Sequence, residues 1–255
     1  MQKNIINNLK ISKLCLGSYQ FFDPKKKMTK QEIKKILFYA IDKGINFIDT
    51  ADEYGNGECE KFLGKLIKEN NLKIIIATKV GQLSNFNTSR LQFEIDDSIK
   101  RLRLEALDIC YFHSGTNKNF FNDNFWEIIQ KNIKCGKIKN AGLSFKSSYV
   151  NMNDFSQIKN MPKFKINILN IIYNPLFDKA EKIFSYCSKK KIKIISRVPF
   201  DKGRVFEDKN KIFIEKKLKD KNINPKKIIN WIKRNKNIES TVFGVTKIKQ
   251  IKELI

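Results

Sequence analysis

The chain has 255 residues, 41% of them hydrophobic, and its 51 Lys and Arg against 26 Asp and Glu give a formal net charge of +25. This length and hydrophobic content exclude a short disulfide-bonded scaffold and a disordered chain, and no apolar run approaches the roughly 18 to 20 residues of a membrane span. Because the N-terminus also lacks the apolar region of a secretory signal, we expect a globular, cytoplasmic protein with no membrane partner.

Short apolar stretches typical of buried strands alternate with helical patterns along the chain, in which apolar residues recur every three to four positions. We expect strands at 13–17, 45–49, 73–79, 107–113, 140–144, 166–172, 191–196 and 240–245. We expect helices at 30–43, 58–69, 89–105, 123–135, 177–190 and 225–235, a weaker one at 147–159 and the start of an eighth at 248–255.

Eight strands that alternate with helices favour one α/β architecture. Nearly continuous apolar strands are typical of a parallel sheet buried on both faces, and eight such units at this length predict a closed (β/α)8 TIM barrel. Its last helix is expected to be shortened, because the sequence ends at Ile255. A doubly wound sheet is the alternative, although no G-x-G-x-x-G motif follows a strand. No Pro- or Gly-rich linker interrupts the chain, so we expect residues 1–255 to form a single domain.

Ionisable residues stand at the ends of three consecutive predicted strands. These strands end at Asp49, Lys79 and His113, and His113 is the only histidine in the chain. Tyr54 follows Asp49 by five residues in the next loop. Since the chemistry of such barrels lies at the C-terminal ends of the strands, we expect these four side chains to meet there.

The physical sense of this set is a tyrosine that donates a proton. A free phenol titrates near ~10, and we expect the Lys79 ammonium to lower the pKa of Tyr54. Asp49 would hold the lysine, because a buried cation without a partner is costly. A neutral His113 could donate a hydrogen bond to a carbonyl oxygen. Such a site would protonate an oxygen that gains negative charge.

Other kinds of chemistry have weaker support in the sequence. The five cysteines are odd in number and widely spaced without a Cys-x-x-Cys pair, so we expect reduced thiols and no metal site. Arg is scarce and Lys is spread through every segment, so we expect no dedicated nucleic-acid partner. A lysine-driven polyanion binder remains a further hypothesis, whose binding would depend strongly on salt. Since the sequence shows no nucleophilic Ser or Cys paired with a base, we expect a cofactor to supply the reactive group.

Three segments resemble the aldo-keto reductase superfamily in order and spacing. They are GINFIDTADEYGNGECEKFLG (44–64), ATKVG (77–81) and the strand that ends at His113. The resemblance extends over almost the whole chain, through LCLGSYQF (14–21), GKIKNAGLSF (136–145), NIIYNPL (170–176), ISRVPFDKG (195–203) and VFGVTKIKQIKEL (242–254). It implies a (β/α)8 barrel that reduces an aldehyde or ketone to an alcohol with NADPH or NADH and without a metal. The catalytic residues it implies are Asp49, Tyr54, Lys79 and His113, with Tyr54 as the general acid.

The resemblance also implies a set of cofactor-binding residues. Ser144 matches the serine that contacts the nicotinamide carboxamide, although Phe145 follows it where Asn is usual. Asn170 stands where Gln is usual, and Arg197 stands where some members carry Arg and many an aromatic ring. The full set is Gly17, Ser18, Ser144, Asn170, Arg197, Pro199, Phe200, Gly203, Gly244, Thr246, Lys247 and Gln250. Because Lys247 is placed for a 2'-phosphate, and because the family leans that way, we expect NADPH in preference to NADH.

The substrate is expected to be a small-molecule carbonyl compound. Aromatic residues in the loops after the strands and the abundant positive charge suit a sugar-type carbonyl or another polar one, including an anionic one. The aromatic residues in question are Tyr19, Phe21, Phe22, Phe86, Phe120 and Phe121, for which core packing is the alternative.

The short C-terminus raises a second hypothesis, a catalytically weak NADP-binding barrel that acts as an interaction or regulatory subunit. A partner subunit would then cover the incomplete wall. We expect a monomer instead, because positive charge on every surface opposes self-association.

Overall fold

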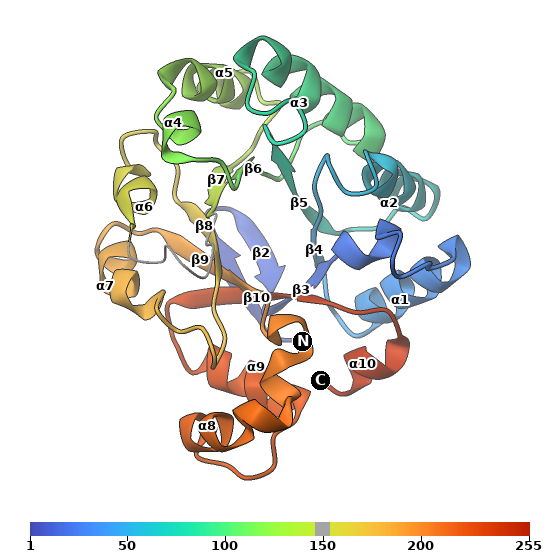
Figure 1. Ribbon diagram of the computed structural model, residues 1–255. Coiled ribbons are helices and arrows are strands. Elements are labelled where there is room, and N and C mark those ends of the chain that lie inside the picture. The colour runs from blue at the N-terminus through green and yellow to red at the C-terminus, as the bar shows by residue number, and fades with distance from the viewer. Residues whose placement is uncertain (146–153) are drawn as a thin grey trace.

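The computed structural model describes residues 1–145 and 154–255, and at its centre eight parallel strands form a closed barrel (Figure 1). In chain order the barrel strands are β3 (Leu14–Gly17), β4 (Phe47–Asp49), β5 (Ile75–Val80), β6 (Ile109–His113), β7 (Ala141–Ser144), β8 (Ile168–Ile172), β9 (Lys193–Arg197) and β10 (Ile238–Gly244). Strand β10 closes the barrel against β3, with Gly244 opposite Gly17. The predicted (β/α)8 barrel is therefore confirmed.

Helices surround the barrel on the outside (Figure 1). They are α1 (Lys30–Asp42), α2 (Glu58–Glu69), α3 (Thr88–Leu102), α4 (Asn117–Phe120), α5 (Asp123–Lys134), α6 (Ser156–Asn160), α7 (Glu181–Lys189), α8 (Asp208–Leu218), α9 (Pro225–Lys233) and α10 (Ile248–Lys252), with 3-10 turns at Tyr19–Phe22 and Asp201–Phe206. Helix α10 has only 5 residues, as expected of a shortened last helix. None of the helices in the described part of the chain is long and apolar enough to cross a membrane.

Four parts of the fold differ from the sequence prediction. The N-terminus forms an antiparallel hairpin of β1 (Lys3–Ile6) and β2 (Leu9–Ser12), which was not expected. Helix α8 is an addition between β9 and α9, and α4 is an addition before α5. Of the weak helix expected at 147–159, residues 147–153 lie outside the described residues, and α6 occupies the end of the range.

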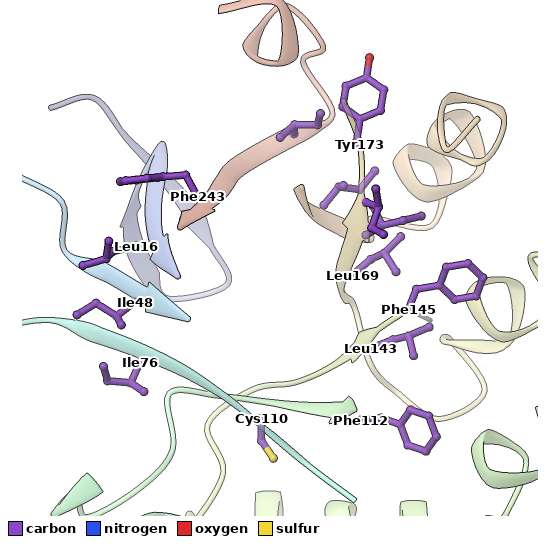
Figure 2. Packing of buried hydrophobic residues seen from close by; sticks show 14 of the residues in the cluster. Leu16, Ile48, Ile76, Cys110, Phe112, Leu143, Phe145, Leu169, Tyr173 and Phe243 are labelled. Carbon is purple, nitrogen blue, oxygen red and sulfur yellow. The ribbon is translucent and has the colours of Figure 1, made fainter. Parts of the chain in front are cut away.

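Side chains on the barrel strands alternate between two cores, because successive residues of a strand point to opposite faces. Leu16, Ile48, Ile76, Leu143 and Leu169 face outward (Figure 2). They belong to one core cluster with apolar residues of the surrounding helices. The inward set fills the barrel, and Ile6 and Ile11 of the hairpin pack against it. The inward set comprises Cys15, Phe47, Ala77, Ile109, Tyr111, Ile168, Ile195 and Val242. The hairpin therefore closes one end of the barrel and leaves the chemistry to the other.

Helix α2, which follows the loop that carries Tyr54, is locked onto α3. Glu60 is fully buried and accepts hydrogen bonds from Arg101 Nε at 2.7 Å and Thr78 Oγ1 at 2.6 Å. The helices also approach closely at Gly64, where a Cβ would overlap the Arg101 carbonyl oxygen and lie 2.5 Å from the Leu102 carbonyl carbon. This packing fixes where the Tyr54 loop ends.

Candidate active site

The candidate site is the last inward-facing layer of the barrel. Asp49, Lys79 and His113 each stand two residues after an inward-facing core residue, namely Phe47, Ala77 and Tyr111. The two-residue period of the other five strands places Gly17, Ser144, Asn170, Arg197 and Gly244 in this layer, with Gly142 as the position before Ser144 and core residues before the other four. Because side chains repeat their direction every two residues along a strand, the eight positions face one space at the C-terminal end of the barrel.

Lys79 is the hub of the site. Its Nζ donates hydrogen bonds to Asp49 Oδ1 at 2.6 Å, to the Thr50 carbonyl oxygen at 2.6 Å and to Tyr54 Oη at 3.1 Å. Lys79 and Asp49 are 2% and 5% exposed. Burial lowers the pKa of Lys79, but Asp49 and Tyr54 outweigh it and raise that pKa above its usual range. The lysine therefore carries a fixed positive charge beside the phenol.

Tyr54 reaches Lys79 from the loop between β4 and α2. The loop is held to β5, because the Thr50 N–H donates to the Ala77 carbonyl at 2.8 Å. Burial raises the pKa of Tyr54 by more than the Lys79 charge lowers it, so the expectation of an acidified phenol is wrong. A sequence cannot show how deeply the ring is buried, and here burial decides the sign. Tyr54 is consequently a protonated hydrogen-bond donor.

His113 lies beside Tyr54, with ring centroids 6.4 Å apart and ring planes at 76°. Burial, Lys79 and Arg197 lower the pKa of His113 well below its usual value, so the ring is neutral at pH 7. Its Nδ1 is buried and has no hydrogen-bond partner among the described residues. Its Nε2 lies 3.5 Å from Oε1 of Glu53. Sequence reasoning missed Glu53, whose only signal is its place directly before Tyr54.

Ser144 and Asn170 continue the layer from His113. The strand register places His113 opposite Ser144 and Ser144 opposite Asn170. Asn170 is fully buried, and within the described part of the chain neither amide atom makes a hydrogen bond of good geometry, although the amide interacts with the nearby Tyr111 hydroxyl. The Ser144 hydroxyl lies 3.3 Å from that of Ser114. A buried amide without a hydrogen bond of good geometry, beside a serine hydroxyl, fits a ligand that carries its own amide, as a nicotinamide does.

Arg197 ends β9 next to this pair. Its Nη2 donates to the Phe145 carbonyl oxygen at 2.9 Å, across the end of the barrel. This bond anchors the guanidinium on the side of β7 to β9. Burial is the largest cause of the lowered pKa of His113, and the Arg197 charge lowers that pKa further. For Tyr54 burial raises the pKa, and the Arg197 charge acts against it.

Gly17 and Ser18 contact the neighbouring strands β4 and β10 at the end of the barrel. The Ser18 N–H and hydroxyl both donate to the Asp49 carbonyl oxygen, at 2.9 and 3.0 Å. A Cβ on Gly17 would lie 3.0 Å from Val242 Cγ1. Both residues therefore have an internal role, and their contact with a cofactor stays a prediction.

The expected phosphate-binding loops lie on neighbouring strands. Pro199, Phe200 and Gly203 follow β9, and Gly203 has a φ of +99° with no described atom within 4 Å of its Cβ position. A Cβ at Gly244 would overlap the Gln20 side-chain amide. Gln250 Oε1 accepts from the backbone N–H groups of Thr246 at 2.8 Å and Lys247 at 3.0 Å, which orders the turn before α10. Lys247 itself is exposed.

The aromatic loop residues divide between the core and the surface. Phe21 and Phe120 are buried in the outer core, and Phe86 packs against Phe112 with centroids 4.8 Å apart. Tyr19 is 56% exposed, and its ring meets that of Tyr54 edge-on at 5.3 Å. Of the six expected residues, Tyr19 is thus the one whose ring contacts the ring of a candidate catalytic residue within the described structure.

The described residues contain no cluster of metal ligands and no disulfide. Across residues 1–145 and 154–255, no group of three or more His, Cys, Asp or Glu is placed to hold a metal ion. The five cysteines are free, and Cys135 alone among them is exposed.

A sequence model of the Aldo/keto reductase family matches residues 13–255. The chain belongs to this family. It is 24% identical over 204 residues to the aldo-keto reductase yakc of Schizosaccharomyces pombe, whose name includes NADP(+), and 28% identical over 212 residues to the uncharacterized oxidoreductase YqkF of Bacillus subtilis. These matches cover 74% and 79% of this chain but only 57% and 65% of the relatives' own lengths.

The fold of this aldo/keto reductase family member also matches solved structures. The holo form of aldo-keto reductase AKR11C1 from Bacillus halodurans superimposes with a TM-score of 0.83 at 21% identity. The match covers 100% of this chain and 89% of that one. It shows that the two proteins share the barrel fold.

Proposed function

We propose that this protein reduces an aldehyde or a ketone to an alcohol with NADPH or NADH, and that Tyr54 donates the proton. The observation that carries the proposal is the contact of Lys79 with both Asp49 and Tyr54, beside a neutral His113. Membership of the aldo/keto reductase family supports an oxidoreductase of this general kind.

The residues of the layer fit a nicotinamide cofactor. Asn170 and Ser144 would bind its carboxamide, since the buried Asn170 amide makes no hydrogen bond of good geometry among the described residues. The open loop at Gly203 and the turn from Gly244 to Gln250 would bind its phosphates, and Lys247 a 2'-phosphate. When bound, the reduced nicotinamide supplies a hydride to the carbonyl carbon.

Side chains of this protein would carry out the proton transfer and stabilise the charges that it leaves. Tyr54 donates a hydrogen bond from its hydroxyl to the carbonyl oxygen and transfers that proton as the oxygen gains negative charge. Lys79 stabilises the phenolate that is left, and Asp49 holds Lys79 in place. His113, which is neutral, directs the carbonyl oxygen through an N–H group.

This arrangement favours an enzyme over a barrel that only binds NADP. A buried ion pair is costly to desolvate, and a protein that merely bound a cofactor would have no need to aim one at a phenol. The Lys79 hydrogen bond to Tyr54 would stabilise the phenolate that remains once the phenol gives up its proton.

A panel of carbonyl compounds tests the proposal. The purified protein is incubated with NADPH or NADH and with aldoses, ketoses, aromatic aldehydes or nucleotide sugars, and both cofactor oxidation and alcohol formation are followed. We expect at least one compound to give equal amounts of alcohol and oxidised cofactor. Tight NADPH binding without turnover of any compound would support the NADP-binding subunit instead.

A further inference from the structure

A second carboxylate lies at the site and has no role in the proton transfer. Glu53 Oε1 is 3.5 Å from His113 Nε2, and the Glu53 side chain is 29% exposed. Burial raises the pKa of Glu53 more than the Lys79 charge lowers it. His113 is the one described residue whose side chain lies within ion-pair distance of this carboxylate, and His113 is neutral. Glu53 thus brings a carboxylate that contacts no Lys or Arg within the described residues, although the Lys79 charge acts on it from a distance.

The other charges of the site are distributed differently. Lys79 is matched by Asp49 at 2.6 Å, so this pair is close to neutral when seen from the substrate. Arg197 is anchored to the Phe145 carbonyl on the side of β7 to β9. Glu53 lies on the loop after β4, which β3 and β10 separate from β9 in the closed barrel. Lys79 and Arg197 act on His113 as positive charges, whereas Glu53 is the carboxylate that approaches His113 from the β4 loop.

We propose that Glu53 determines which carbonyl compounds the site accepts, an inference that rests on the proposed function. The substrate carbonyl must lie against Tyr54 and His113, so a substituent next to it on this side meets Glu53. A hydroxyl there donates a hydrogen bond to the carboxylate, whereas a carboxylate or phosphate is repelled. Neutral hydroxylated carbonyl compounds are admitted and anionic ones rejected, which reverses the expectation from net charge that anionic substrates would suit the site.

The test compares two aldehydes of nearly equal size, glycolaldehyde and glyoxylate, in wild type and in Glu53→Gln. The variant keeps the shape of the side chain and removes its charge. The control is Glu58→Gln, which changes the net charge equally but at an exposed position paired with Lys61. Each kcat/KM for glyoxylate is divided by that for glycolaldehyde. The hydrated fraction of each aldehyde is the same in every assay, so it does not affect the comparison of this ratio between variants.

We expect this ratio to rise about tenfold in Glu53→Gln, the scale of one partly screened charge at close range. It should stay within about twofold of wild type in Glu58→Gln. The inference is overturned if the two variants give the same ratio.

A binding measurement separates the failure of this inference from the failure of the proposed function. Benzoate and benzamide are titrated by calorimetry into each protein with NADP+ present, and the ratio of their affinities should favour benzoate about tenfold more in Glu53→Gln than in wild type. If no variant reduces any carbonyl compound, the proposed function is wrong, and the binding ratio alone decides the role of Glu53. An unchanged binding ratio contradicts the inference even if the enzyme is active.

Discussion

The Lys79 ammonium lies 2.6 Å from the Asp49 carboxylate, and the two side chains are 3% and 7% exposed. The pair joins β5 to β4 at the end of the barrel and gives Tyr54 its cationic neighbour. Removal of either charge leaves the other buried without its partner, so the pair links the stability of the barrel to the chemistry of the site.

Lys79→Met should therefore cost about 3 to 5 kcal/mol of the free energy of unfolding, because Asp49 stays buried and loses its cation. Lys61→Met is the matched control, since Lys61 Nζ lies 2.6 Å from Glu58 Oε1 and the two side chains are 58% and 51% exposed. Such a pair is worth less than about 1 kcal/mol. Urea unfolding of the three proteins measures both values, and equal losses would contradict the account.

Much of this site could be predicted because its positions follow a regular pattern. Asp49, Lys79 and His113 end apolar runs, and the two-residue period of a strand places them on the inside of the barrel. The position of Tyr54 could be predicted because it ends a motif of fixed length that begins at Asp49. These four depend on local order in the chain, which a sequence shows directly.

Other features depend on contacts that the sequence does not show. The sign of the Tyr54 pKa shift depends on how much of the ring the barrel covers, and Glu53 matters only because its loop turns it towards His113. The N-terminal hairpin has strands of 4 residues each, too short for a clear alternation, and its apolar residues have meaning only against the closed barrel. Helix α8 lacks a marked apolar face, with Ile212 and Phe213 exposed, so no helical period revealed it.

The stability of the protein should fall with rising pH because of Asp52. Asp52 is fully buried, and burial together with Glu94 and Glu60 raises its pKa to about 8. An unfolded Asp titrates near ~3.9, so between these values the folded state holds a proton that the unfolded state has lost. The folded state is therefore favoured at low pH, and this contribution is lost as the pH rises towards about 8.

Asp52→Asn should remove this dependence. The free energy of unfolding of the variant, relative to that of wild type, should be about 2 kcal/mol higher at pH 8 than at pH 5. This change is below the limit of roughly 1.4 kcal/mol per pH unit that one titrating group can contribute. Urea unfolding at both pH values measures it, with the exposed Asp42→Asn as control. A stability difference that does not change between pH 5 and pH 8 would show that Asp52 is already ionised in the folded protein.

Gly64→Ala should destabilise the protein although alanine favours helices. The new Cβ would overlap the carbonyl of Arg101 and push α2 away from α3. We expect a loss of about 1 to 3 kcal/mol. Lys65→Ala, at the next and exposed position of the same helix, should change stability by less than about 0.5 kcal/mol. Thermal unfolding compares the two, and a stabilised Gly64→Ala would mean that the helices are not in contact there.

Lys247→Met should weaken NADPH binding about tenfold and leave NADH binding unchanged, because only NADPH carries the 2'-phosphate that this cation would meet. Lys249→Met is the control, as Lys249 is also exposed and lies two residues further along. Fluorescence titration of both cofactors gives the four affinities. An equal loss for NADPH and NADH would assign Lys247 to another part of the cofactor.

The most direct test of the central claim is the turnover of Tyr54→Phe with a carbonyl compound that the wild type reduces. The variant keeps the ring and loses only the hydroxyl that Lys79 contacts. We predict that its affinity for NADPH stays within about twofold of wild type, while the rate of a single turnover falls about 100- to 10,000-fold, as expected when a general acid is removed. A variant that bound NADPH normally and reduced the carbonyl at the wild-type rate would contradict the assignment of Tyr54 as the proton donor.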